Sequence, residues 1–145
     1  MPITVETYSD NKYQYSVDLM HAYINLQQPE KQKIETSNFL FNLDFNCWDK
    51  NTKPSHVISC IKNKKYKDEV KRITESNLEY PIIVDNNLFI IDGMHRFVKS
   101  VLNNKSTIDV YIFDKKIMKK FIIGTLGKKQ NLTISDYIEL YQKRF

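Results

Sequence analysis

The second half of the chain contains two short β-branched runs separated by a turn, and this feature constrains the fold most. The first run, 82–84, follows Pro81, whose missing N–H group suits the start of a strand. Residues 85–87 read Asp-Asn-Asn, and Asn tolerates the positive φ that tight turns require. A second apolar run over 88–92 ends in an acid. The pattern predicts two adjacent strands joined by a tight turn.

A helix and a third strand are expected directly after these strands. Over 93–104 the apolar residues recur at helical spacing and predict one buried face, formed by Phe97, Val98, Val101 and Leu102. The β-branched run over 106–114 predicts a third strand. The succession therefore predicts a small sheet with a helix beside it.

The first half of the chain is predicted to be mainly helical. Ser16 is placed to cap a helix that ends before Pro29. The apolar content of 37–48, with Ser37 as a candidate cap, predicts a helix that lies mostly in the core. The sequence also predicts a strand at 3–8, a short edge strand at 33–35 and a short helix over 56–63 opened by Ser55. A polar helix is expected over 64–77, with Tyr66, Val70 and Ile73 as its apolar stripe. Residues 115–127 are expected to form a short helix that runs into a strand or a loop, and 133–145 a C-terminal helix capped by Thr133 or Ser135.

We therefore expect an α+β fold in which helices pack around a small mixed β-sheet. The 145 residues fit one domain over 1–145. No apolar run approaches the roughly 20 residues of a membrane span, and residues 1–10 lack the pattern of a signal peptide. We expect an intracellular, cytoplasmic protein with no membrane contact. The abundance of Lys, Asn and Ile is typical of coding in an AT-rich genome, such as that of a virus or a parasite.

The cysteines and histidines give no sign of a disulfide or a metal cluster. Cys47 and Cys60 form no CxxC motif, and two reduced thiols in the core are expected rather than a disulfide. The three histidines, His21, His56 and His95, lack metal-ligand spacing. The net charge of +5 suits an anionic partner such as nucleotide or nucleic acid, although lysines on solvated faces would give the same total.

The residues from Asp92 to Arg96, between the second strand and the helix, are suited to binding phosphate. The first turn of a helix offers free N–H groups and a partial positive charge, which attract anions. Gly93 lets a ligand approach the backbone closely, Arg96 has a planar fork that matches phosphate oxygens, and His95 adds a donor. Asp92 can hold a divalent metal ion or accept a proton from an attacking hydroxyl. Such a set fits phosphoryl transfer.

The same residues also have a purely structural interpretation. Asp92 would be a helix N-cap, Arg96 its ion-pair partner and His95 a packed ring. The pattern alone gives this interpretation about as much support as the phosphate site.

Two weaker signals concern stacking and charge. Trp48, with several Phe residues nearby, has a ring that can stack on a base, although core packing is favoured. The lysine-rich runs at 62–67 and 114–120 have the charge to follow a nucleic-acid backbone, although a solvated surface is favoured.

The segment YPIIVDNNLFIIDGMHRFVKSVLNNKSTIDVYIF resembles the ParB/sulfiredoxin superfamily, over about residues 78–113. Its members share a Pro-Ile-x-Val-like strand, a turn, a strand ending near Asp-Gly, a His-Arg or Arg-Arg pair, a helix and a further strand. The resemblance implies a ParB/sulfiredoxin-like fold in which Gly93, Met94, His95 and Arg96 line a nucleotide phosphate site.

Met94 distinguishes the branches of that superfamily. Sulfiredoxins have a cysteine here that reduces a sulfinic acid, and a thioether cannot replace that thiol. Chromosome-partition ParB proteins have Gly-Glu-Arg-Arg and continue into a helix-turn-helix domain, for which too few residues follow. ADP-dependent free-serine kinases carry Asp-Gly-His-His-Arg, which residues 92–96 match except at Met94.

The resemblance to the kinase branch implies binding of ATP or ADP with Mg²⁺, followed by phosphoryl transfer or nucleotide hydrolysis. Asp92 and His95 would be catalytic, Asp92 would also bind the metal ion, and the acceptor would be a small molecule or a protein. Glu35, Glu79 and Asp85 are further candidates by position only.

Two alternative functions stay open from the sequence. One is a ParB-like DNA-binding or nuclease module, supported by the charge of +5 and the lysine runs. The other is a non-catalytic, nucleotide-responsive binding domain.

Overall fold

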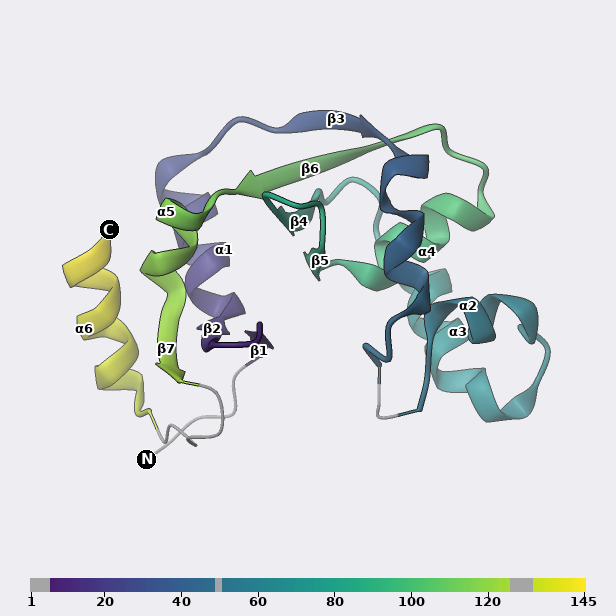
Figure 1. Ribbon diagram of the computed structural model, residues 1–145, viewed down its shortest axis with the longest axis horizontal. Coiled ribbons are helices and arrows are strands. Elements are labelled where there is room, and N and C mark those ends of the chain that lie inside the picture. The colour runs from purple at the N-terminus through teal and green to yellow at the C-terminus, as the bar shows by residue number, and fades with distance from the viewer. Residues whose placement is uncertain (1–5, 49–50, 126–131) are drawn as a thin grey trace. The chain divides into compact units, whose positions relative to one another are not determined.

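The computed structural model in Figure 1 describes residues 6–48, 51–125 and 132–145. It has two small sheets and several helices, which confirms the expected α+β class. The chain divides into two compact units, one formed by Met1–Glu30 with Phe113–Phe145 and the other by Lys31–Ile112. Among the described residues, none of the helices has the length and apolar character that crossing a bilayer requires.

The first unit joins the two ends of the chain in a three-stranded antiparallel sheet of order β1-β2-β7. The carboxylate of Asp10 holds the β1–β2 turn by accepting from the backbone N–H groups of Lys12 at 2.8 Å and Tyr13 at 2.7 Å. The elements of this unit are β1 (Thr7–Ser9), β2 (Tyr13–Ser16), α1 (Val17–Gln27), α5 (Lys115–Met118), the 3-10 helix η3 (Lys119–Phe121), β7 (Ile122–Thr125) and α6 (Ile134–Arg144).

Side-chain caps begin both long helices of this unit. Ser16 accepts from the backbone N–H of Leu19 at 3.1 Å, as predicted for the start of α1. At α6 the cap is Thr133, which forms a reciprocal capping box with Asp136. The open choice between Thr133 and Ser135 is thereby settled.

The core of the first unit is largely aromatic. The Tyr23 ring lies edge-on to Phe113 and Phe121, each at 5.6 Å between centroids, and to Phe145 at 5.7 Å. The Arg144 guanidinium donates to the carbonyl oxygens of Lys120 and Ile122, which fixes the end of α6.

The second unit contains the segment that the sequence identified as a candidate site. Its four strands have the order β3-β6-β4-β5, with β3 at an edge as predicted, and β3 runs antiparallel beside β6 (Figure 1). The elements are β3 (Gln32–Glu35), the 3-10 helix η1 (Thr36–Asp44), α2 (Pro54–Ser59), the 3-10 helix η2 (Lys64–Tyr66), α3 (Lys67–Glu75), β4 (Ile82–Asp85), β5 (Ile90–Asp92), α4 (Met94–Leu102) and β6 (Thr107–Phe113).

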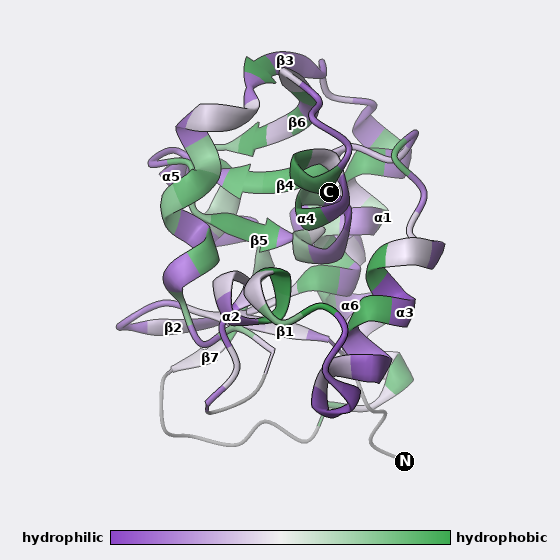
Figure 2. Ribbon diagram, turned by 90° about the vertical axis from the view of Figure 1, so that its right-hand side faces the viewer, coloured by the Kyte–Doolittle hydropathy of each residue, from purple (hydrophilic) through white to green (hydrophobic). Residues whose placement is uncertain are grey.

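Helix α4 is anchored by two adjoining apolar clusters. Phe97 packs with Phe39, Ile82 and other residues of the sheet, and the Phe39 and Phe97 rings meet edge-on at 5.9 Å. Val98 belongs to the second cluster, with Val57 and Ile73. Figure 2 shows hydrophobic colouring along β4 and on α4. Two buried neighbours in sequence therefore fix both the position and the rotation of this helix.

The segment 37–48 differs from its prediction as a mostly buried helix. It forms η1 and then a loop, and the N-cap is Glu35 without a side-chain bond, not Ser37. A 3-10 helix repeats every three residues, so Phe39 and Asn42 face inward while Phe41 is exposed. Buried Asn42 donates to the carbonyl of Leu88 and accepts from the N–H of Ile90, which ties η1 to the β4–β5 hairpin.

The β4–β5 turn is tight, as predicted, but its positive φ is not at an asparagine. The Asp85 carboxylate accepts from the N–H groups of Asn87 at 2.8 Å and Phe89 at 3.0 Å. These bonds place Leu88 in the left-handed region, with φ of 66°. The prediction that the Asn pair would supply this conformation was wrong.

Other differences are local. Helix α2 begins at Pro54 with Lys53 as its cap, rather than after Ser55, because Pro suits the first helical position. The polar helix is divided into η2 and α3. Residues 115–125 form α5, η3 and then β7, as expected for a short helix that runs into a strand, and 126–127 lie outside the described residues. Only residues 7–8 of the strand expected at 3–8 belong to β1, residues 3–5 being outside the described residues. The strand β2 was not expected.

Several side chains expected in the core are exposed. Leu102, at the end of α4, was expected on the buried face of the helix and is 37% exposed. Cys47 and Cys60 are free, as expected, but both are exposed, because Cys47 lies in the loop after η1 and Cys60 ends α2.

Candidate functional site

Gly93 makes the turn from β5 into α4, and the backbone there requires glycine. Its φ is +103°, which side chains rarely permit. A Cβ atom would lie 2.6 Å from Cγ2 of Ile82 and 2.8 Å from Nη2 of Arg96. The chain therefore passes close beneath these two side chains, and Gly93 is the N-cap of α4 without any side-chain cap.

The first turn of α4 presents backbone donors. The N–H of Phe97 makes the first intrahelical bond, to the carbonyl of Gly93 at 2.9 Å. The N–H groups of Met94, His95 and Arg96 precede that bond, so helix geometry gives them no intrahelical acceptor. Three backbone donors and the positive end of the helix dipole thus coincide with the motif that the sequence identified.

Arg96 is held loosely by the residues around it. Its Nη2 donates to the carbonyl of Pro81 at 3.3 Å and to Oδ2 of Asp92 at 3.4 Å. Both distances exceed the 2.7–2.9 Å typical of a strong charge-assisted bond. The buried Nε has no hydrogen-bond partner within the described part of the chain. The guanidinium therefore keeps unused capacity for an acceptor.

The ion pair between Asp92 and Arg96 agrees with one part of the structural interpretation. Asp92 does not cap the helix, however, since the N-cap is Gly93. Asp92 lies at the end of β5, opposite Ile83 in β4. Its carboxylate is already paired with a cation, which lowers its availability as a base.

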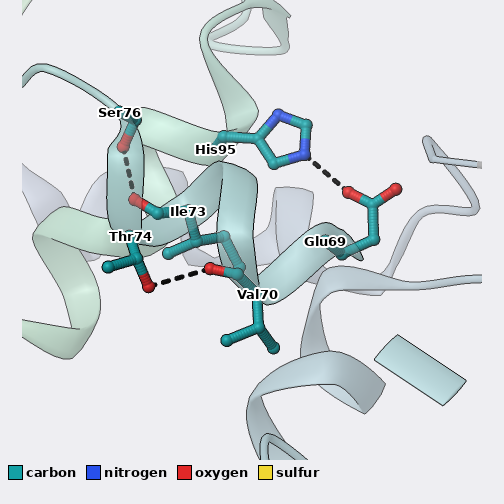
Figure 3. Close-up of polar contacts among 6 residues, drawn as sticks. All are labelled: Glu69, Val70, Ile73, Thr74, Ser76 and His95. Carbon is teal, nitrogen blue, oxygen red and sulfur yellow. Dashed lines mark hydrogen bonds and ion pairs between the residues drawn. The ribbon is translucent and has the colours of Figure 1, made fainter. Parts of the chain in front are cut away.

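His95 is held on two sides. Its Nε2 is 2.6 Å from Oε2 of Glu69 in α3, and the imidazole ring points from α4 toward that carboxylate (Figure 3). The ring also stacks on the indole of Trp48, with centroids 4.6 Å apart and planes inclined by 12°. The sequence motif did not indicate either contact.

Helix α3 is fixed in the orientation that aims Glu69 at His95. Lys99 Nζ, one turn beyond His95, donates to the carbonyl oxygens of Thr74 at 2.9 Å and Ser76 at 2.7 Å. The Ser76 hydroxyl in turn donates to the carbonyl of Ile73, which closes the end of α3 (Figure 3). The α3–α4 contact is therefore bonded at its far end as well as at Glu69.

The remaining sequence candidates lie elsewhere in the unit. The Met94 side chain packs against both apolar clusters, so only its backbone is presented at the helix start. Asp85 is occupied in the hairpin turn, Glu35 ends β3, and Glu79 lies in the turn before β4. Of these, only Met94 belongs to the motif.

The described residues do not form a ready-made magnesium site. None of their His, Cys, Asp and Glu side chains gather in groups of three or more suited to a metal ion. Asp92, the expected ligand, is paired with Arg96. Mg²⁺ is commonly held by one or two carboxylates together with substrate phosphates, and here the phosphates would supply most of its ligands.

The chemistry of Cys47 argues against thiol catalysis beside this site. Burial by the surrounding atoms, with Glu69 adding its negative charge, raises the pKa of the Cys47 thiol to about 11, although the residue has exposed surface. A thiol of that pKa is almost entirely protonated at neutral pH, and the thiol is a poor nucleophile.

Glu69 is the site residue that sequence reasoning missed. Its position in the sequence gave one indication. Glu69 adjoins the apolar stripe of Tyr66, Val70 and Ile73, and a residue beside such a stripe lies near the edge of the buried face of its helix.

Comparisons with known proteins add no relative: no protein-family model, curated protein or solved structure matches this chain.

Proposed function

We propose that the residues Gly93 to Arg96 bind the phosphates of a nucleotide, ATP or ADP. The observation that carries the proposal is the turn at Gly93, where a strand delivers the chain to a helix start with three N–H groups free of intrahelical bonds. His95 and Arg96 lie in that same turn. In other proteins, phosphate groups bind at helix N-termini of this kind.

The reaction proposed for this site is phosphoryl transfer or nucleotide hydrolysis in a ParB/sulfiredoxin-like protein. Its support is the resemblance of residues 78–113 together with the strand, turn, strand and helix that the segment forms. Arg96 would neutralise phosphate charge, and its unpartnered Nε leaves it capacity to do so. Mg²⁺, if it accompanies the nucleotide, would add further charge neutralisation.

Isothermal titration with ATP, ADP, CTP and GTP, in buffer containing Mg²⁺, tests the binding step. An Arg96→Met variant should lose about 10- to 100-fold in affinity, as expected for a charge-assisted bond. Lys33→Met is the matched control, because Lys33 is a cation of the same unit that pairs with Asp109 on the neighbouring strand. It should bind as the wild type does. Absence of heat with all four nucleotides would refute the proposal.

A nucleic-acid interface is the second candidate, on one observation. The lysines of the run at 62–67 are all exposed, as a solvated surface would also require. DNA binding through them should weaken steeply with salt, by about one power of salt concentration for each phosphate contacted. A gel shift at low salt, repeated with Lys64→Gln and Lys65→Gln, separates the candidates, since nucleotide binding at α4 should not respond to these changes.

A further inference from the structure

The contact between Glu69 and His95 determines which ring nitrogen carries the proton. A carboxylate can only accept, so at 2.6 Å the Nε2 of His95 must be the donor. In a neutral imidazole the lone pair is then on Nδ1. Nδ1 has no hydrogen-bond partner in the described residues.

The ring cannot easily turn to exchange its two nitrogens. Trp48 covers one face at 4.6 Å and packs in turn against the Val57, Ile73 and Val98 cluster. Glu69 is itself held by α3, whose far end is bonded to Lys99 of α4. Side chains from two other segments, Trp48 and Glu69, therefore hold the ring in one orientation.

We propose that Glu69 is a positioning residue that keeps His95 in the Nε2–H form, so that Nδ1 of His95 is the proton acceptor of the reaction. This inference rests on the proposed function and changes the role of Asp92. Asp92 is paired with Arg96, whereas His95 belongs to the first turn of α4 and its Nδ1 has no hydrogen-bond partner within 6–48, 51–125 and 132–145. The arrangement matches the rule that a catalytic base is oriented by a third group.

The step is balanced with ATP as the phosphoryl donor. The acceptor, a hydroxyl or water, loses its proton to Nδ1 as its oxygen bonds to the terminal phosphorus. The bond from that phosphorus to the bridging oxygen breaks, and ADP leaves with the electron pair. Nδ1 then returns the proton to solvent, while Glu69 stabilises the transient imidazolium through Nε2.

The tautomer can be measured without any nucleotide. Nitrogen NMR of histidine-labelled protein, at alkaline pH where imidazole is neutral, distinguishes protonated from unprotonated ring nitrogens. His95 is assigned by its loss in His95→Gln, and His21 and His56 are internal references. We expect His95 in the Nε2–H form, and a mixture of forms in Glu69→Gln. A predominantly Nδ1–H ring in the wild type would overturn the proposal.

Kinetics separate this inference from the proposed function. Glu69→Gln should lower kcat by about 10- to 100-fold with the ATP Kd changed less than about twofold, because Glu69 acts through His95 and not on the phosphates. Glu75→Gln, an exposed acid of the same helix, is the control and should behave as the wild type. Unchanged kcat in Glu69→Gln, or no turnover by the wild type, would overturn the role of His95 while leaving nucleotide binding intact. Loss of all binding would instead refute the proposed function.

Discussion

Gly93 shows how one residue can set the geometry of a whole site. A left-handed φ at the junction of β5 and α4 aims the first turn of α4 away from the strand, and only glycine adopts it without strain. The resemblance identified Gly93 as a ligand-facing residue. The structure adds that its missing side chain also makes room for Ile82 and Arg96.

Gly93→Ala should therefore destabilise the protein by about 1–3 kcal/mol, through backbone strain and a Cβ contact with buried Ile82. Urea unfolding followed by circular dichroism measures the change. Gly124→Ala is a suitable control, because Gly93 is the one glycine with positive φ among the described residues. A Gly93→Ala protein as stable as the wild type would show that the turn is not as tight as described.

Among the elements, η1 shows why apolar content alone misplaced the core. Its 3-10 repeat turns Phe39 inward and leaves Phe41 at the surface, against Phe45 and Phe89. A repeat of 3.6 residues per turn would place Leu40 on the buried face with Phe39, whereas Leu40 is 44% exposed and Asn42 is buried in its place. The buried Asn42 is likewise explained only by its bonds to the β4–β5 hairpin.

Two phenylalanines give a direct test of this assignment. Phe97→Ala should cost about 3–5 kcal/mol of unfolding free energy, because its ring is fully buried between η1 and the sheet. Phe41→Ala should cost about 1 kcal/mol or less, since its ring is 41% exposed. Equal losses in the two variants, measured by urea unfolding, would contradict the packing described.

The capping box of α6 should be sensitive to acid. The Asp136 carboxylate accepts from the backbone N–H and the hydroxyl of Thr133, and these bonds lower its pKa below the usual 3.8. A lowered pKa in the folded state means that the contribution to helix stability is complete above about pH 4 and is lost as pH falls through the lowered value. The protection of the α6 amides against hydrogen exchange, expressed relative to their intrinsic exchange rate at each pH, should therefore fall over that range.

Asp136→Asn provides the control for this acid sensitivity. Its side chain cannot ionise, so the α6 amides of the variant should not lose protection as the pH falls below about 4. An equal loss of protection in the variant and the wild type would assign the effect to another group.

At the scale of the whole molecule, local patterns were predictable and distant contacts were not. The succession β4, β5, α4 and β6 follows from alternation, turn residues and helical spacing within one continuous segment. The contacts that complete the site join positions far apart in sequence, as Glu69 and His95 are, 26 residues apart, or Asn42 and Ile90, 48 apart. Nothing in a single sequence specifies such pairs, because they arise only when helices pack.

The candidate site was likewise predicted only in part. The residues of the motif, Asp92 to Arg96, were identified from the sequence, and the structure places them at a strand-to-helix junction as expected. Their partners were not identified: the stacking of Trp48 on His95 and the pairing with Glu69 both come from other segments. In our proposal these partners change the roles: Glu69 orients His95, while Asp92 is paired with Arg96.

The central claim is that phosphate binds to the first turn of α4, and a nucleotide titration followed by amide NMR tests it most directly. ATP added to nitrogen-labelled protein should shift the amide resonances of Gly93, Met94, His95 and Arg96 first and furthest, and tripolyphosphate should shift the same four, because both present phosphate oxygens to the same N–H groups. Shifts confined to the lysine run at 62–67, or no shifts at saturating ATP, would contradict the account.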